Sequence, residues 1–223
     1  MSRRIAAIIP MRHDSERVHG KNYRPLGGRP LFHHVVGTLL DCPTITDVII
    51  DTDSAVITDD AQRSFPTVQI VERPEHLRDG AIPMNDVLRN DLNQVAADLY
   101  LQTHSTNPFL RAESVKAAID CLAAAPDHDS LFSVTRLQTR LWARDATPIN
   151  HDPRRLLRTQ DMEPTFEENS CIYLFTRESF ESSGGRIGRQ PLLFEIARSE
   201  AWDIDTEDDF RVAEALHAAR MAT

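Results

Sequence analysis

The stretch IIPMRHDSERVHGKN, residues 8–22, joins an apolar strand pattern directly to a cationic loop. The apolar run over residues 5–9 is typical of a strand buried on both faces. Five cations follow within eighteen residues, and they are opposed only by Asp14 and Glu16. These cations are Arg12, Arg17, Lys21, Arg24 and Arg29. Such a loop after a buried strand predicts an α/β fold with an anion site at a strand end.

The chain as a whole is acidic, which makes this loop unusual. It contains 25 Lys and Arg against 34 Asp and Glu, for a net charge of -9. The electrostatic field of this net negative charge opposes binding to a nucleic-acid backbone or an anionic membrane. We therefore predict neither as a partner. A small polyanion remains compatible with the loop. The 223 residues suffice for a sizeable core, and we predict a single domain over residues 1–223.

The three cysteines give no sign of a cross-linked or metal-bound framework. Cys42, Cys121 and Cys171 are far apart and form no CxxC pair. The N-terminal apolar run is too short for a secretory signal, and no stretch of about 18 apolar residues occurs. We therefore expect reduced thiols and a cytoplasmic location.

Strand-like and helix-like patterns alternate along most of the chain. The predicted strands are 5–9, 47–51, 67–71, 99–102, 130–137 and 171–175, and the predicted helices are 31–40, 54–65, 85–98, 112–125 and 207–221. This rhythm predicts a mostly parallel sheet with helices on both faces. Residues 138–190 interrupt it with several prolines and the turn SSGGRIG, and we expect this excursion to form a dimerisation contact.

The cationic loop lacks the Walker A and GxGxxG patterns, so it is neither a P-loop nor a dinucleotide fingerprint. Arg12 offers a planar fork and Lys21 a mobile point charge, and a triphosphate attacked at its α-phosphorus uses both kinds of contact. Ser15 adds a hydroxyl donor. A solvated surface loop is the alternative interpretation.

Two aspartates near the C-terminus, Asp203 and Asp205, flank Ile204. In an extended segment both carboxylates lie on one face, and the isoleucine points to the core. Two such close carboxylates are typical ligands of Mg²⁺. Alternatively, they favour only the positive end of the following helix, which begins near Thr206 with a capping-box pattern.

The segment QTHSTNP, residues 102–108, places polar side chains at another predicted strand end. Gln102, His104 and Ser105 are suited to hydrogen-bonding a polyhydroxylated ligand, although a lone histidine is more often structural. No nucleophile elbow or HExxH spacing occurs, so hydrolase and zinc interpretations have little support.

Together these segments resemble the acylneuraminate cytidylyltransferase (CMP-sialic acid synthetase) family, which is similar in turn to the Kdo cytidylyltransferases. The matching segments, in family order from residue 5 to about 217, are PMRHDSERVHGKN, GGRPLFHHVV, DVIIDTDS, VERPEHL, LQTHSTNPFL, ENSCIYLF and DIDTEDDFRVAEAL. The resemblance implies a Rossmann-like nucleotidyltransferase fold that uses CTP, a nonulosonic (2-keto sugar) acid and Mg²⁺ to make a CMP-sugar and pyrophosphate.

The resemblance also implies roles for individual residues. Arg12 and Lys21 would act on the triphosphate as catalytic residues, with Ser15, Asn22 and Arg73 completing the nucleotide site. Gln102, His104 and Ser105 would meet the sugar. Asp203 and Asp205 would hold the metal. Arg158 and Gln160, in the excursion, would bind the substrate carboxylate across a homodimer interface.

Several departures from the family pattern leave alternatives open. THSTNP replaces a PTSP loop, EENS with Glu167 and Glu168 replaces an NG pair, and PMND replaces a serine-rich helix start. The sugar is therefore not fixed, and no cytosine-reading residue is assigned at 83–86. Kdo or another sugar acid, another nucleoside triphosphate, and a non-catalytic nucleotide-sugar-binding module remain as rivals. Retention of both the cationic residues and the aspartate pair argues against the last.

Overall fold

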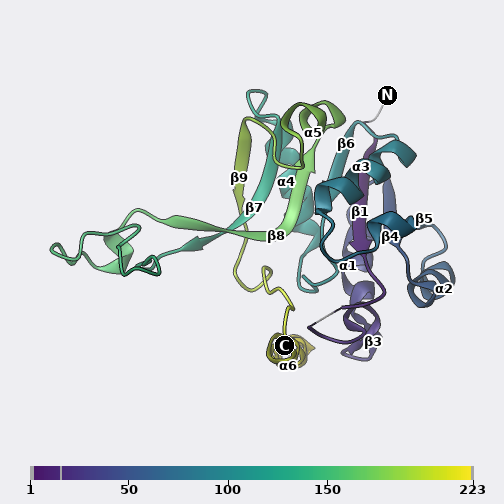
Figure 1. Cartoon of the computed structure of the whole chain (residues 1–223), viewed down its shortest axis with the longest axis horizontal. Coiled ribbons are helices and arrows are strands. Elements are labelled where there is room, and N and C mark those ends of the chain that lie inside the picture. Colours follow the sequence, from purple (N-terminus) through teal and green to yellow (C-terminus); the bar gives the residue numbers. More distant parts are fainter. Residues whose placement is uncertain (1–2, 16, 222–223) are drawn as a thin grey trace.

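A seven-stranded sheet forms the centre of the molecule (Figure 1). The computed structural model describes residues 3–15 and 17–221. The strands of the sheet are β1 (Ile5–Met11), β4 (Asp47–Thr52), β5 (Gln69–Glu72), β6 (Leu99–Gln102), β7 (Ser130–Leu137), β8 (Thr165–Phe175) and β9 (Pro191–Glu195). Their order is β5-β4-β1-β6-β8-β7-β9, and only the pairs made by β8 are antiparallel. The predicted mostly parallel α/β sheet is confirmed.

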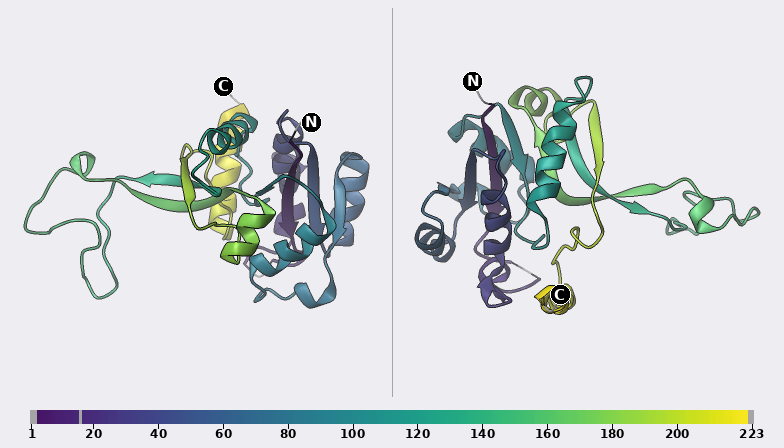
Figure 2. Two further views of the ribbon diagram at one scale, coloured as in Figure 1. Left: turned by 90° about the horizontal axis from the view of Figure 1, so that it is seen from above. Right: turned by 180° about the vertical axis from the view of Figure 1, so that it is seen from behind.

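Helices cover both faces of this sheet (Figure 2). They are α1 (Leu31–Leu40), α2 (Ala55–Ser64), α3 (Met84–Gln94), α4 (Ala112–Ala123), α5 (Arg177–Ser183) and α6 (Glu207–Met221). Alternate residues of β1 join different clusters: Ala7 and Ile9 pack on the α1 and α4 side, and Ala6 and Ile8 on the α3 and α5 side. A central strand buried on both faces is what the apolar run predicts. Among the described helices, each falls short of the length and apolarity needed to span a bilayer.

A short β-hairpin with a two-residue turn links the cationic loop to α1. Its strands are β2 (Pro25–Leu26) and β3 (Arg29–Pro30), and Gly27 and Gly28 between them have φ values of 57° and 82°. Glycine reaches these left-handed conformations at little cost, which explains the pair of glycines. Leu26 packs in one apolar cluster with Phe210 of α6 and with Ile204. This third cluster brings the C-terminal segment to the cationic loop.

A long arm leaves the sheet between β7 and β8 (Figure 1). Within the range 138–190 that we predicted as an excursion, residues 138–164 form this arm and include the short 3-10 helix η3 (Thr159–Asp161). The remainder returns to the body, because β8 lies between β6 and β7 and α5 packs on the sheet through Phe180. Whether the arm mediates dimerisation remains a prediction.

Most predicted elements match the structure with small shifts, although β8 begins six residues before the predicted strand 171–175, and several short elements were missed. The helix predicted over 85–98 ends at Gln94, where Val95 turns extended and accepts a hydrogen bond from the Tyr100 hydroxyl. Besides the hairpin β2–β3 and the 3-10 helices, the short helix α5 and the strand β9 were not predicted. The side chain of Thr176 caps α5, and Gly184 ends it with a φ of 81°.

Candidate functional site

The carboxyl ends of three adjacent parallel strands place the predicted loops at one edge of the sheet. Met11 of β1 lies beside Thr52 of β4, and Ile8 of β1 lies beside Gln102 of β6. The cationic loop, the DTDS turn and the QTHSTNP segment therefore meet where open α/β sheets bind ligands.

Hydrogen bonds between these loops hold the cationic loop in place. The backbone N–H of His13 donates to Asp53 Oδ1 at 2.7 Å. The Asn22 amide donates to the Arg12 carbonyl at 2.8 Å and accepts from the Ser105 hydroxyl at 2.7 Å. Asn22 thus connects the loop after β1 to the loop after β6. Asn22 lines the cavity described below, and its side chain supports the loop in this structure. Its contact with a nucleotide stays a prediction.

The C-terminal aspartate segment meets the cationic loop from the other side. Lys21 Nζ donates to the Ile204 carbonyl at 2.6 Å and lies 3.5 Å from Asp205 Oδ1. Arg17 Nη2 donates to the same Asp205 oxygen at 2.7 Å. Burial lowers the pKa of Lys21, while Asp205 and then Asp203 act in the opposite direction. The structure therefore brings the two predicted groups together.

A cavity of about 420 Å³, here called the central cavity, opens at this edge. It collects seven predicted site residues: Arg12, Ser15, Lys21, Asn22, Arg73, His104 and Ser105. The half-buried guanidinium of Arg12 has no hydrogen-bond or ion-pair partner among the residues that the structure describes. A cation that faces a cavity without a protein partner is well placed to receive an anion.

Arg73 forms a buried ion pair under the wall of the central cavity. Its Nε and Nη2 donate to Asp51 Oδ2 at 2.9 Å and 2.5 Å, and both side chains are almost fully buried. Asp91 of α3 is also fully buried, and its Oδ2 has no hydrogen-bond partner in the described structure. Burial first, and then the charge of Asp51, raises the pKa of Asp91 to about 8. Asp51 thus holds the guanidinium of Arg73 in position and balances its charge.

Gln102 is buried and fully engaged at the floor of the site. Its Nε2 lies 2.8 Å from the Thr103 carbonyl and 3.1 Å from His104 Nε2, and its Oε1 accepts from Arg186 at 2.6 Å. Burial, together with the charges of Arg186 and Lys21, lowers the pKa of His104 to about 3. His104 is therefore a neutral hydrogen-bonding group. Gln102 reaches a ligand only if it exchanges one of these partners.

Asp203 provides the observation that bears on a metal ion. Its Oδ1 is buried without a hydrogen-bond partner in the described part of the chain. Burial raises the pKa of Asp203, and a hydrogen bond from Thr106 acts in the opposite direction. The described residues contain no group of three or more His, Cys, Asp or Glu side chains that forms a complete metal site. Because Mg²⁺ commonly binds through one or two carboxylates plus substrate phosphates and water, the donor set fits it.

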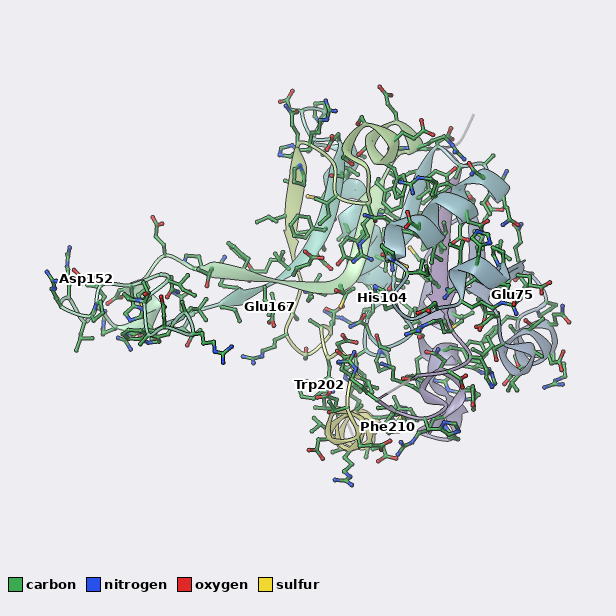
Figure 3. All side chains as sticks on the ribbon, in the orientation of Figure 1. Glu75, His104, Asp152, Glu167, Trp202 and Phe210 are labelled. Atoms are coloured by element: carbon green, nitrogen blue, oxygen red, sulfur yellow. The ribbon has the colours of Figure 1, made fainter. Side chains whose placement is uncertain are left out.

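The arm keeps two predicted residues away from the central cavity of the same chain. Arg158 is exposed and pairs with its neighbour Asp161 at 2.6 Å, and Gln160 is also exposed. In Figure 3, Asp152 marks the distant end of the arm, and His104 lies in the body. Arg158 and Gln160 are therefore not joined to the other site residues within one chain.

Sequence reasoning missed three charged residues beside the site, namely Asp51, Asp91 and Arg186. Asp51 offered a signal, because a carboxylate within a buried strand pattern needs a cation. Asp91 sits in a helix of mixed polarity, and nothing in that pattern marks it as buried. Arg186 lies in the SSGGRIG turn, which the sequence identified only as an interruption.

A mostly parallel sheet with a cationic loop after an inner strand, and with aspartates against that loop, defines an α/β nucleotidyltransferase. A family model described as cytidylyltransferase matches residues 6–197. The chain belongs to this cytidylyltransferase family.

Relatives and solved structures agree with this assignment. The chain is 28% identical to CMP-N,N'-diacetyllegionaminic acid synthase of Legionella pneumophila, across 96% of both chains. It is 23% identical to N-acylneuraminate cytidylyltransferase of Streptococcus agalactiae, across 91% of this chain and 51% of that protein. The structure of CMP:2-keto-3-deoxy-manno-octonic acid synthetase complexed with CTP aligns with a TM-score of 0.75 at 16% identity, covering 97% of this chain and 99% of the other. The similarity to this solved structure supports the assignment of the fold.

Proposed function

We propose that the protein transfers CMP from CTP to a sialic-acid-like 2-keto sugar acid and releases pyrophosphate. One observation carries the proposal: Arg12 and Lys21 line an open cavity at one edge of the sheet, and Asp205 lies 3.5 Å from Lys21. Membership of the cytidylyltransferase family supports CTP as the donor. The full-length relative that makes a CMP-legionaminic acid supports a sugar acid as the acceptor.

The chemistry that we propose consists mainly of positioning and charge stabilisation. The anomeric hydroxyl of the sugar acid attacks the α-phosphorus, a new P–O bond forms, and the hydroxyl proton is released. The bond to the bridging oxygen breaks, and pyrophosphate leaves. The guanidinium of Arg12, which has no partner among the described residues, and the ammonium of Lys21 stabilise the growing charge on this leaving group. Arg73 contacts the nucleoside end from the cavity wall.

Asp203 and Asp205 are the residues that we propose to hold Mg²⁺. When bound, the ion supplies Lewis-acid neutralisation of the phosphate oxygens. Arg17 and Lys21 pair with Asp205 in the structure, so they balance its charge before the nucleotide arrives. The unpartnered, buried Asp203 Oδ1 supports a ligand role.

We also propose that the active form is a cytoplasmic homodimer joined through the arm, residues 138–164. The arm exposes four large apolar side chains, Trp142, Ile149, Leu156 and Leu157, which a second copy would cover. Arg158 and Gln160 would then reach the partner's central cavity and bind the carboxylate of the sugar acid. No nucleic acid or membrane is part of this proposal.

Pyrophosphate release tests the proposal. The protein is incubated with Mg²⁺, each nucleoside triphosphate in turn and a panel of 2-keto sugar acids that includes Kdo. The proposal predicts release with CTP that depends on a nonulosonic acid. Release with Kdo alone would support the Kdo alternative. Absence of any sugar-dependent release would support the non-catalytic binding module.

A further inference from the structure

His104 lines the central cavity on a loop that departs from the family pattern. The segment THSTNP replaces the PTSP loop, so the role of this histidine does not follow from family membership. One ring nitrogen, Nε2, lies 3.1 Å from the amide nitrogen of Gln102. The other, Nδ1, has no hydrogen-bond partner among the described residues. The position of the ring proton therefore decides what His104 offers to a ligand.

The orientation of the Gln102 amide is fixed by two neighbours. Arg186 Nη1 donates to the amide oxygen at 2.6 Å, and a guanidinium has only donors to offer. The amide nitrogen donates to the Thr103 carbonyl at 2.8 Å. The reverse orientation would set two donors against each other at Arg186 and two acceptors against each other at Thr103. The amide nitrogen is therefore the atom that faces His104.

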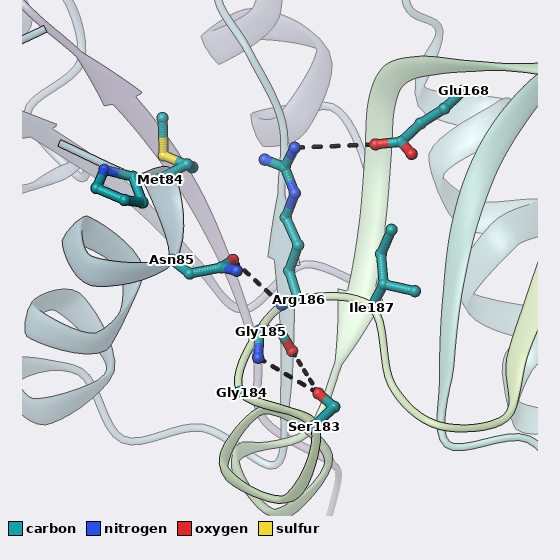
Figure 4. Close-up of a pocket in the computed structure, with 9 residues that line it drawn as sticks. Met84, Asn85, Glu168, Ser183, Gly184, Gly185, Arg186 and Ile187 are labelled. Carbon is teal, nitrogen blue, oxygen red and sulfur yellow. Dashed lines mark hydrogen bonds and ion pairs between the residues drawn. The ribbon is translucent and has the colours of Figure 1, made fainter. Parts of the chain in front are cut away.

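Arg186 is itself held in place. It extends from the turn after α5, beside the start of α3 (Figure 4). Its guanidinium stacks on the Tyr173 ring, 3.7 Å from the centroid, and its backbone N–H donates to the Asn85 amide oxygen. The series of contacts from Arg186 through Gln102 to His104 thus begins at a fixed group.

These contacts determine the tautomer of His104. The amide N–H of Gln102 needs an acceptor, so Nε2 carries a lone pair and the proton of the neutral ring lies on Nδ1. Burial opposes a second proton, as do the two charges that face the ring, those of Arg186 and Lys21. Nδ1 is not among the enclosed polar atoms that lack a partner, so a ligand in the central cavity can reach it. The side chain therefore presents an N–H donor without a charge.

The order of the strands places His104 at the end of the central cavity away from the nucleoside. Arg73 follows β5, the cationic loop follows β1 and His104 follows β6, and these strands run in the order β5-β4-β1-β6. The cationic loop thus lies between Arg73, at the proposed nucleoside end, and His104. A sugar acid that approaches the phosphates from the far side meets His104.

We propose that His104 donates a hydrogen bond from Nδ1–H to an acceptor oxygen of the bound sugar acid, and that Gln102 is a positioning residue that fixes this tautomer. The contact rests on the proposed function and deepens it, because it assigns a specific donor to the acceptor substrate. Gln102, whose amide oxygen and nitrogen are already engaged, acts on the acid through His104.

NMR of protein labelled with ¹⁵N-histidine measures the tautomer directly, through couplings between ring nitrogens and ring protons. The loss of one set of signals in His104→Asn identifies His104. We expect Nδ1 protonated and Nε2 unprotonated in the free wild type, and a shift of the Nδ1–H signal when the sugar acid is added. Gln102→Glu should protonate Nε2, because a carboxylate accepts where the amide donated. If this buried variant does not fold, the wild-type spectrum carries the test by itself.

Steady-state kinetics tests the contact with the acid. His104→Leu should lower kcat/KM for the sugar acid by about tenfold or more and leave the KM for CTP unchanged, because the acceptor oxygen loses its donor. His104→Asn should recover most of this loss, since its amide N–H takes the place of Nδ1–H. His76→Leu is the matched control. His76 is exposed outside the central cavity, and this variant should keep the full kcat/KM.

The possible failures are distinguishable. A wild type with Nε2 protonated, or a His104→Leu variant that keeps its kcat/KM for the acid, overturns the inference and leaves the proposed function standing. A wild type that releases no pyrophosphate with CTP and any 2-keto sugar acid overturns both.

Discussion

The ammonium of Lys21 lies 3.5 Å from the carboxylate of Asp205, although the two residues stand near opposite ends of the chain. Lys21 also donates to the backbone carbonyl of Ile204, which is itself buried against the hairpin and α6. Apolar packing of Ile204 therefore fixes the distance between the cationic loop and the aspartate pair. The same contact keeps a buried cation neutralised until an anionic nucleotide arrives.

Lys21→Met should lower kcat/KM by about a hundredfold or more, because it removes a preorganised positive charge at the leaving group. Steady-state pyrophosphate release measures this effect. Arg29→Gln is the control, since Arg29 is an exposed cation on β3 outside the central cavity. If Lys21→Met retains near wild-type turnover, the loop is not the triphosphate site.

Asp205→Ala should abolish turnover with a small effect on the melting temperature. Its ion pair with Arg17 is largely exposed, and such pairs contribute about 1 kcal/mol or less. Its other partner, the buried Lys21, keeps its hydrogen bond to the Ile204 carbonyl and the nearby charge of Asp203. Magnesium titration of the rate, together with thermal unfolding, separates the two effects. Asp208→Ala, in the exposed first turn of α6, should leave the magnesium dependence unchanged. Full activity of Asp205→Ala at ordinary Mg²⁺ concentrations would contradict a metal-ligand role.

Asp91→Asn should make stability less dependent on pH. The folded-state pKa of Asp91 is about 8, against an ordinary value of 3.8, so the folded protein binds an extra proton between these values. The stability that protonated Asp91 contributes is complete below about pH 4 and is lost as the pH rises through about 8. Asparagine carries no charge at either pH. The free energy of unfolding of the variant minus that of the wild type should therefore be greater at pH 9 than at pH 6.

Urea unfolding at the two pH values measures the difference. Asp86→Asn provides the comparison, because Asp86 lies on the same helix but is exposed and paired with Arg89. Equal changes in the two variants would show that Asp91 titrates normally.

Leu156→Glu should convert the proposed dimer to a monomer, because it puts a charge on the most exposed apolar side chain of the arm. Sedimentation velocity measures the mass. Val56→Glu introduces the same charge at another exposed aliphatic residue, on α2 and away from the arm. A monomeric wild type would contradict the dimer proposal.

Mixing two inactive variants tests whether the arm completes the partner's site. Lys21→Met and Arg158→Gln should each have low activity alone. After subunits exchange, half of the dimers are mixed and each contains one intact site, so about a quarter of wild-type activity should return. No recovery from a mixture shown to exchange subunits would place Arg158 outside the site.

The sheet was predictable because its signals are local. Apolar runs and amphipathic stretches gave the strands and helices to within a few residues, and Ile204 between two aspartates indicated which side faces the core. The short elements α5 and β9 were not predictable, because about two turns of helix and a strand that begins with proline carry weak periodicity.

The nucleotide end of the candidate site was predictable, because charged residues follow predicted strands in the sequence. The structure brings Arg12, Lys21 and Asp205 together there. The remaining charges depended on tertiary contacts. Asp51 and Arg73 pair across adjacent strands, and Arg186 reaches Gln102 from a turn 84 residues later. Such pairs have no local pattern, and so only the folded chain shows them.

Transfer of the α-phosphate tests the central claim most directly. The protein is incubated with α-³²P-labelled CTP, Mg²⁺ and a nonulosonic acid, and the products are separated by chromatography. The account predicts that the label appears in a sugar-linked nucleotide, only when the acid is present, and never in pyrophosphate. Label that stays in CTP, or that appears as free CMP independently of the sugar acid, would contradict it.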